Sequence, residues 1–328
     1  MDGLLIVDKP VGPTSHDVVA RVRQALGERR VGHTGTLDPA AGGVLPMVVG
    51  RATRLAQFLS GADKVYEATL TLGMTTDTYD ALGQPAGAPY SGPFPGRETV
   101  EDALDRFRGT FVQQPPAFSA KKVEGTRSYR HARAAARAAK ESGNPAAASE
   151  AGERQRVERP ALPAAVLVTA HAIDLLDVQG SRVVLRVHCS AGFYLRSLAH
   201  DLGERLGTGA CLAALTRTRC GDAALADAVP LATIERDRAA GTRALIPLSH
   251  MLPALAAVVL TGEGVRRAVH GREVGPGEVA GRTEDPRGPG GPGSVVPLVR
   301  LLDESGDLVG IAEPGSSPGF LHPSVVLK

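Results

Sequence analysis

The sequence predicts an α+β protein that ends in a small β domain, and three patterns support this fold class. The apolar run LLIVDKP is typical of a short strand that Pro10 stops, and helix signals follow it. Residues 164–194 alternate apolar and polar side chains around a turn at Gln179 and Gly180, which indicates an antiparallel hairpin. Beyond Pro247, short β-like runs such as VPLVRLLD and LVGIAEP replace the helical pattern.

Two helices are predicted in the first part of the chain. Ser15 is suited to be the N-cap of the first helix, with Asp17 in its first turn, and the helix should run to about Gly27. The second helix should begin at Thr99, where Asp102 takes the capping-box position in TVEDALDRFRG. Each helix therefore has a start signal in its own local sequence.

A loop, a strand and a short helix complete the predicted elements. The glycine and proline content of residues 31–43 predicts an irregular but structured loop before the apolar VLPMVV. Residues 66–73, YEATLTLG, alternate as a strand does. Ser197 is predicted to cap a short helix that ends near Gly207.

A domain boundary is predicted where the pattern changes near Pro247. Residues 1–248 then form one large domain, and residues 131–156 within it are a polar, alanine-rich variable insertion. Residues 249–328 form the small β domain, which is interrupted by the glycine- and proline-rich GRTEDPRGPGGPG.

Composition excludes several classes of protein. The first residues, MDGLLIVDKP, lack the basic and apolar regions of a signal peptide, and no later run is apolar enough to span a bilayer. We therefore expect a cytoplasmic protein without a membrane partner. Three cysteines without a CxxC pair argue against a disulfide scaffold. A net charge of +2 does not by itself predict a nucleic-acid partner.

The segment GHTGTLDP is the first candidate for chemistry, because its glycines allow tight turns while the carboxylate of Asp38 points outward. Pro39 biases Asp38 toward an extended conformation and so restricts the orientation of the carboxylate. From these residues alone, the favoured interpretation is a structural turn in which Asp38 bonds nearby backbone amides. A phosphate nest is a weaker alternative, because no P-loop or GxGxxG pattern is present here.

Four segments follow one another as a set of motifs: LLIVDKPVGPTSHDVV, VGHTGTLDPAAGGVLP, PPAFSAKKVEGTRSYRHAR and CSAGFYLRSLAHDLGERLGTGA. In this order they resemble the motifs of the bacterial tRNA pseudouridine-55 synthases, the TruB family, and together they span most of residues 3–219. The resemblance implies a pseudouridine-synthase catalytic domain with a central mixed, mainly antiparallel sheet flanked by helices. It also implies a C-terminal PUA-like β-barrel that binds RNA.

The resemblance further implies roles for individual residues. Asp38 would be the catalytic residue, and Arg196 would pair with its carboxylate. Tyr66 would stack on the base and relay the final proton. The other substrate-binding residues would be His33, which is inserted into the tRNA loop, Tyr194 and Leu215, which line the uracil pocket, and Lys9, a structural residue near that pocket.

The implied reaction is the isomerisation of uridine 55 in the T loop of tRNA to pseudouridine. The N-glycosidic bond breaks, the uracil rotates, and the base rejoins the ribose through carbon 5. This reaction requires an ionised carboxylate and a base flipped out of its loop. It requires no cofactor and no metal. We accordingly expect the tRNA T stem-loop as partner, no obligate protein partner, and a monomer.

Two other patterns could carry chemistry. SAKK, residues 119–122, fits the SxxK pattern of serine acyl-enzymes, but the companion motifs SDN and KTG are absent. Zinc ligands could be sought among His188, Cys189, His200, Cys211 and Cys220. Because Cys189 directly follows His188 on a predicted strand, the two side chains should face opposite sides, and no metal site is expected.

Two competing functions stay open. A guide-RNA-dependent homologue that acts in a complex would keep the chemistry and change the substrate, although the bacterial-style N-terminal sequence and the lack of basic tails argue against it. An RNA-folding protein whose catalysis is secondary is the other. Refolding of tRNA by an Asp38→Asn variant would detect that second role.

Overall fold

The computed structural model divides the chain into two compact units. The first unit comprises Met1–Ala62 and Arg219–Lys328, and the second comprises Asp63–Thr218. The residues described are 1–117, 122–123, 126–127, 163–282 and 298–328. The predicted insertion at 131–156 and Ser119 of the SAKK pattern lie outside them. The boundary between residues 248 and 249 stays a prediction.

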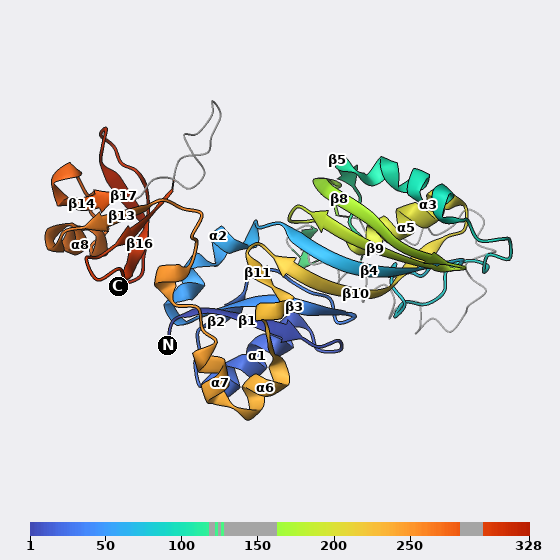
Figure 1. Ribbon diagram of the computed structural model, residues 1–328, viewed down its shortest axis with the longest axis horizontal. Coiled ribbons are helices and arrows are strands. Elements are labelled where there is room, and N and C mark those ends of the chain that lie inside the picture. The colour runs from blue at the N-terminus through green and yellow to red at the C-terminus, as the bar shows by residue number, and fades with distance from the viewer. Residues whose placement is uncertain (118–121, 124–125, 128–162, 283–297) are drawn as a thin grey trace, which may run out of the picture. The chain divides into compact units, whose positions relative to one another are not determined.

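The first unit is built around a buried strand pair. β1 (Gly3–Lys9) pairs antiparallel with β3 (Ala41–Val49) along its full length, and every residue of β3 is buried. β2 (Val31–His33) is antiparallel to β3, and β12 (Val229–Pro230) is parallel to β1. Three helices pack together on one side of these strands (Figure 1): α1 (Ser15–Leu26), α6 (Leu231–Arg236) and α7 (Arg238–Arg243).

The predicted end of helix α1 is confirmed, and its predicted start is wrong by one residue. Its N-cap is Thr14, not Ser15, and a capping box joins Thr14 to Asp17. The predicted cap was wrong by one residue because Ser15 bonds the distant Leu37 instead. The helix ends as predicted, at Gly27 in the left-handed conformation (φ 63°).

The glycine-rich loop is shorter than the sequence predicts. β2 and the start of β3 lie inside residues 31–43, which were expected to hold no regular element. Antiparallel pairing of Val31 with Val49 and of His33 with Met47 overrides the local preference of the glycines.

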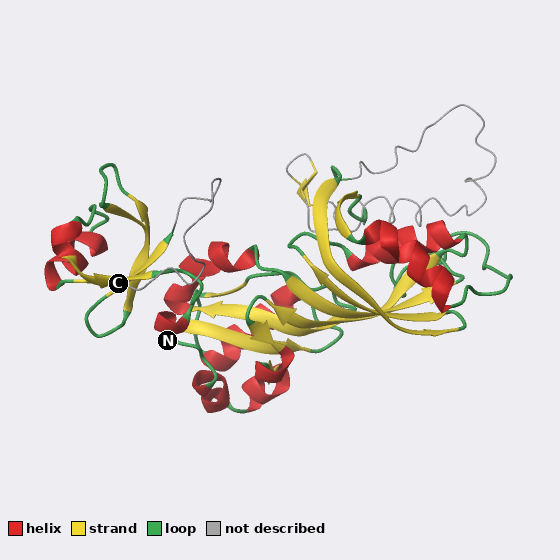
Figure 2. Ribbon diagram, turned by 45° about the horizontal axis from the view of Figure 1, so that its top comes forward, coloured by secondary structure: helices red, strands yellow, loops and turns green. Residues whose placement is uncertain are grey.

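The second unit contains an antiparallel sheet in the order β4–β9–β8–β5. Its strands are β4 (Lys64–Leu72), β9 (Arg182–Cys189), β8 (Val166–Gln179) and β5 (Gly109–Gln113). Helices α3 (Arg97–Leu104) and α5 (Leu195–Leu206) contact each other and pack against these strands (Figure 2). The predicted hairpin is confirmed, with Gly180 in the left-handed conformation at its turn (φ 57°).

Helix starts in this unit differ from the predictions. α3 begins at Arg97 after Gly96, not at Thr99. α5 begins at Leu195 after Tyr194, so the predicted Ser197 cap is wrong. The hydroxyl of Ser197 donates a hydrogen bond to the Gln114 carbonyl oxygen at 2.7 Å, a long-range partner that local sequence does not reveal.

Short elements complete the two units. They are η1 (Gly50–Leu55), α2 (Ala56–Ser60), η2 (Asp105–Phe107), β6 (Lys122–Val123), β7 (Thr126–Arg127), β11 (Ala223–Ala224), η3 (Leu225–Asp227) and η4 (Leu248–His250). β10 (Ala210–Cys220) carries the chain from the second unit back to the first.

The C-terminal part of the first unit forms a second sheet, in the order β14–β13–β15–β16–β17. Its elements are β13 (Ala257–Leu260), α8 (Gly262–Val269), η5 (Pro276–Glu278), β14 (Val279–Arg282), β15 (Val299–Leu302), β16 (Leu308–Pro314) and β17 (Leu321–Val326). An apolar core of its own includes Leu260, Leu301 and Val309. A large mixed sheet with helices and a second, C-terminal sheet confirm the predicted α+β fold class.

No helix among the described residues is both long enough and apolar enough to cross a membrane.

Candidate active site

The loop that carries Asp38 is fixed by bonds on both sides of that residue. The Ser15 hydroxyl, which is 1% exposed, donates to the Leu37 carbonyl oxygen at 3.0 Å and accepts from the Leu37 amide at 2.9 Å. After Asp38, its carbonyl accepts from the amide of Ala41 at 3.0 Å, and the Pro39 carbonyl accepts from the amide of Gly12 at 2.8 Å. The backbone is therefore held on both sides of the half-buried Asp38.

Lys9 stabilises the end of the same loop through hydrogen bonds. Its side chain is fully buried, and its ammonium donates to the carbonyl oxygens of Ala41 at 2.6 Å and Pro10 at 3.0 Å. A buried charge is tolerated only when polar groups replace water around it. Two backbone carbonyls do so here, so Lys9 joins β1 to the first residue of β3.

His33 ends β2 directly before this loop. Its ring meets His16 edge to face, with centroids 5.5 Å apart, and the side chain is half-buried. The resemblance predicts insertion of His33 into an RNA loop, and its place at the end of a paired strand gives it a fixed backbone.

Arg196 is the second residue of α5 and is only 7% exposed. Its Nη1 donates to the Thr78 carbonyl oxygen at 3.2 Å and lies 3.8 Å from the Asp80 carboxylate. Asp80 is in turn held by the Thr78 hydroxyl at 2.8 Å and by the Leu82 amide at 3.1 Å. Asp80 is not among the site residues that the sequence predicts, although the four polar residues 75–78 before it in TTDTYD are typical of a structured turn.

The turn before Asp80 contains an unusual backbone conformation. Tyr79 has a φ of 62°, which side-chain-bearing residues rarely adopt. Its ring stacks on His200 of α5, with centroids 3.9 Å apart and planes 6° from parallel. Burial raises the pKa of the Tyr79 hydroxyl, and the nearby Asp201 and Glu204 carboxylates add to the effect. The stacked pair ties the Asp80 turn to the helix that carries Arg196.

The remaining predicted site residues belong to the same unit as Arg196. Tyr66 lies on β4 opposite Val187 and is 8% exposed. Tyr194 precedes α5, and both its amide and its carbonyl bond the buried Gln113 side chain, at 2.8 and 3.0 Å. Leu215 is half-buried on β10.

The predicted residues thus form two groups. The loop of the first unit carries Asp38, with His33 before it and Lys9 bonded to its end at Ala41. The second unit holds Tyr66, Tyr194, Arg196 and Leu215. The pairing of Arg196 with Asp38 stays a prediction.

The sequence predicts that His188 and Cys189 face opposite sides of their strand, and the structure confirms this. Cys189 is fully buried, whereas the side chain of His188 is 45% exposed, so neighbouring residues on β9 face opposite sides. Burial raises the pKa of the Cys189 thiol to about 12, so the thiol stays protonated at neutral pH.

Two family models match the chain. Residues 23–146 match the N-terminal domain of TruB family pseudouridylate synthases, and residues 196–259 match the C-terminal domain of tRNA pseudouridylate synthase B. The tRNA pseudouridine synthase B of Solibacter usitatus is 39% identical over 330 residues, covering 100% of both chains. That of Gloeobacter violaceus is 45% identical over 282 residues, covering 86% of this chain and 89% of its own. The chain belongs to the TruB family of pseudouridylate synthases.

Solved structures agree with a TruB fold. The archaeal box H/ACA sRNP Nop10–Cbf5 complex contains a chain with a TM-score of 0.67 and 23% identity, covering 99% of this chain and 86% of that one. A chain in the structure of an H/ACA RNP bound to a substrate RNA containing 2′-deoxyuridine matches this chain with the same TM-score and the same identity. At this level of identity the likeness concerns the fold alone. As a TruB family member the protein is an RNA-modifying isomerase.

Proposed function

We propose that this TruB family enzyme isomerises uridine 55 in the T loop of tRNA, with Asp38 as the catalytic carboxylate. Relatives that align over most of the chain are tRNA pseudouridine synthases B, which supports a tRNA substrate. The observation that carries the assignment of Asp38 is its loop, in which the backbone is anchored on both sides of a half-buried carboxylate. A reacting group needs a fixed position, and this loop supplies one.

In the proposed reaction the bond between N1 of uracil and C1′ of the ribose breaks. The Asp38 carboxylate either adds to C1′ or removes the 2′ proton, and both routes release the uracil for rotation. A bond then forms between C5 and C1′. In the first route the bond between C1′ and the Asp38 oxygen breaks at this step, and in the second route the 2′ proton returns to C2′. The C5 proton leaves and N1 gains a proton, so the isomerisation is balanced without a cofactor.

The other predicted residues have supporting roles in this proposal. The guanidinium of Arg196 has five N–H donors, so the same group that contacts Asp80 can also hold the Asp38 carboxylate in its ionised form. Tyr66 stacks on the base and relays the C5 proton, and Tyr194 and Leu215 line the uracil pocket. His33 takes the place of the flipped base. Lys9 fixes the loop through Ala41.

The C-terminal sheet is the PUA-like part of the proposal. Residues 249–328 would contact RNA beyond the T loop, and the protein would act as a cytoplasmic monomer without an obligate protein partner. The end of the catalytic domain at residue 248 is part of the same proposal.

Tritium release from a T stem-loop RNA labelled at C5 of uridine tests the assignment. Replacement of Asp38 by Asn keeps the shape of the side chain and removes the charge, and we expect turnover to fall by at least about 10³-fold. The matched control is Asp222→Asn, an exposed carboxylate of the same unit. Undiminished release by the Asp38 variant would contradict the mechanism.

A second RNA, in which cytidine replaces uridine 55, tests the position. Release from the wild-type protein should disappear although the other uridines stay labelled. Continued release at the original rate would show that a different uridine is the target.

A further inference from the structure

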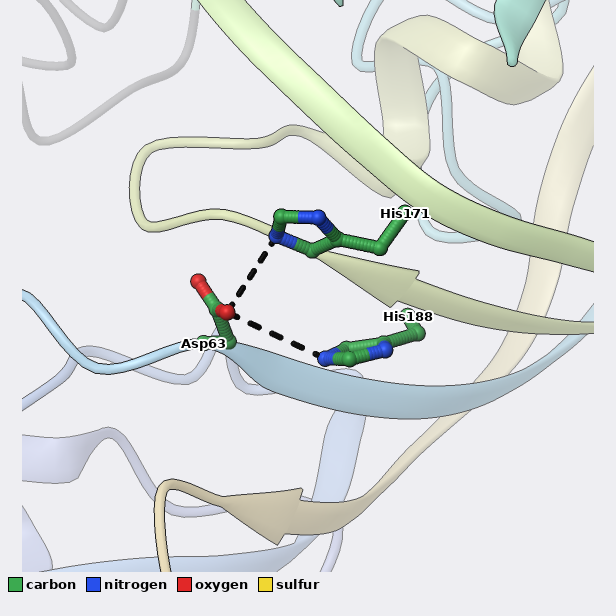
Figure 3. A group of neighbouring side chains, drawn as sticks. All are labelled: Asp63, His171 and His188. Atoms are coloured by element: carbon green, nitrogen blue, oxygen red, sulfur yellow. Dashed lines mark ion pairs between the residues drawn. The ribbon is translucent and has the colours of Figure 1, made fainter. Parts of the chain in front are cut away.

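Three side chains with metal-binding atoms converge on the surface of the second unit, outside the proposed active site. Nε2 of His171 lies 3.2 Å from Oδ2 of Asp63, and Nε2 of His188 lies 3.9 Å from the same oxygen. Figure 3 shows both imidazole edges directed at this carboxylate. One ligand atom from each residue lies within 4.8 Å of the other two. Two imidazole nitrogens and one carboxylate oxygen therefore surround a small common volume.

The pairing of β8 with β9 places the two histidines on one face of the sheet. Ala170 pairs with Cys189 on the buried face. Because neighbouring side chains on a strand face opposite sides, His171 and His188 both lie on the other face. A register shift leaves His171 as an extra residue on β8, and the two ring centroids are 4.8 Å apart at 47°.

The group lies on the face of the sheet that is opposite to Tyr66. In the pairing of β4 with β9, Tyr66 is opposite Val187, and Val65 is opposite His188. Alternation places Tyr66 and Val187 on the buried face and His188 on the other. The side chains of Asp63, His171 and His188 are 38–49% exposed, so a dissolved ion can reach them.

We propose that Asp63, His171 and His188 bind one divalent transition-metal ion of the Zn²⁺ type. Imidazole nitrogens suit Zn²⁺, Co²⁺ and Ni²⁺, and a carboxylate supplies a third ligand and a negative charge. A tetrahedral Zn²⁺ with bonds of about 2.0–2.2 Å separates its ligand atoms by roughly 3.4 Å. The Asp63–His171 distance of 3.2 Å is already close to this spacing, and rotation of exposed side chains can shorten the others. Water completes the coordination.

The alternative is an ordinary surface ion pair between a carboxylate and protonated histidine. Such pairs contribute little and need no second imidazole. Here one carboxylate oxygen faces two imidazoles from two different strands, β8 and β9. The bound ion would join the start of β4 to β8 and β9.

Titration of metal into chelator-treated, full-length protein tests the proposal. Zn²⁺ and Co²⁺ should each bind with one equivalent in calorimetry, and Co²⁺ should develop visible ligand-field bands without a sulfur charge-transfer band, because all three cysteines are buried. Mg²⁺ serves as a negative control, since it prefers all-oxygen ligands.

Variants locate the site. His188→Ala and Asp63→Asn should weaken Zn²⁺ binding by more than the ~10- to 100-fold that loss of an outer-shell partner produces. His322→Ala, which removes an exposed histidine of the first unit, should leave affinity unchanged. Circular dichroism of the metal-free variants confirms that they fold. Equal affinity of His188→Ala and His322→Ala, or no binding by wild type, would overturn the proposal.

Discussion

The two groups of proposed site residues are held by different kinds of contact. In the first unit, Lys9 and Ser15 bond to backbone atoms around Asp38, so they fix the course of a loop. In the second unit, the side chain of Asp80 and a backbone carbonyl hold the Arg196 guanidinium, so they orient a charge. The first arrangement depends on the shape of the backbone, and the second depends on electrostatics. Substitutions in the two groups should therefore differ in their effects on turnover and on stability.

After Asp38→Asn, the largest effect on turnover is expected for Arg196→Lys. Lysine keeps the charge but lacks the planar fork, so it should not hold both a carboxylate and the Thr78 carbonyl oxygen. Turnover should fall by about 10²–10³-fold, as it does when an electrostatic stabiliser is removed from other enzymes. Affinity for the T stem-loop should change only a few-fold.

Single-turnover tritium release and RNA binding, measured on the same protein, provide this comparison. Arg186→Lys is the matched control, because that arginine is exposed in the same unit and pairs with Glu67 at 3.1 Å. Collapse of RNA binding with normal turnover of bound RNA would make Arg196 a phosphate clamp.

A smaller effect on turnover and a larger one on stability are expected for Lys9→Met. Methionine fills a similar volume, but the carbonyls of Ala41 and Pro10 lose a charged donor. We expect the free energy of unfolding to fall by about 2 kcal/mol and turnover by about tenfold, because the loop beside Asp38 relaxes.

Urea unfolding and tritium release measure the two quantities for the Lys9 variant. Lys328→Met removes a lysine from a surface pair with Asp303 and should change unfolding by less than about 1 kcal/mol. A stable Lys9 variant with no turnover at all would give Lys9 a direct role in the reaction.

Much of the fold was predictable because the strand and helix patterns are local. The first strand, which Pro10 stops, the 164–194 hairpin and the glycine ends of α1 and α5 are confirmed. Helix starts were less predictable, because the hydroxyls of Ser15 and Ser197 bond partners far away in the sequence. Capping rules consider only the next few residues and cannot detect such competition.

Site residues that lie in a sequence motif were predictable. Site residues that only their spatial contacts identify were not. Asp38 and Arg196 lie in recognisable segments. Asp80 became visible only through its distance to Arg196. Asp63, His171 and His188 lie far apart in the sequence, so their convergence became visible only through the distances between their side chains.

Asp80→Asn should reduce turnover less than Arg196→Lys does. The amide oxygen of asparagine still accepts from the Thr78 hydroxyl and the Leu82 amide, so the turn survives, but the charge beside Arg196 is lost. We expect about a tenfold decrease in turnover, equivalent to roughly 1.4 kcal/mol. Asp77→Asn is the control, because this exposed carboxylate accepts only a backbone bond from Gln84 among the contacts seen. Equal effects of the two variants would mean that Asp80 acts through the shape of its turn.

The smallest effect on turnover is expected from metal removal. The proposed metal site in the second unit shares no residue with the contacts around Asp38 or those around Arg196. Because His188 and Tyr66 lie on opposite faces of the sheet, stripping the protein with a chelator and then desalting it should leave tritium release unchanged. Stability should respond instead: Zn²⁺ at 100 times its dissociation constant should stabilise the folded protein by about 2.7 kcal/mol. Thermal melts with and without Zn²⁺ measure this difference, and Asp63→Asn should abolish it. A stripped protein that loses turnover and regains it with Zn²⁺ would instead connect the metal to the reaction, against the separation of the two faces.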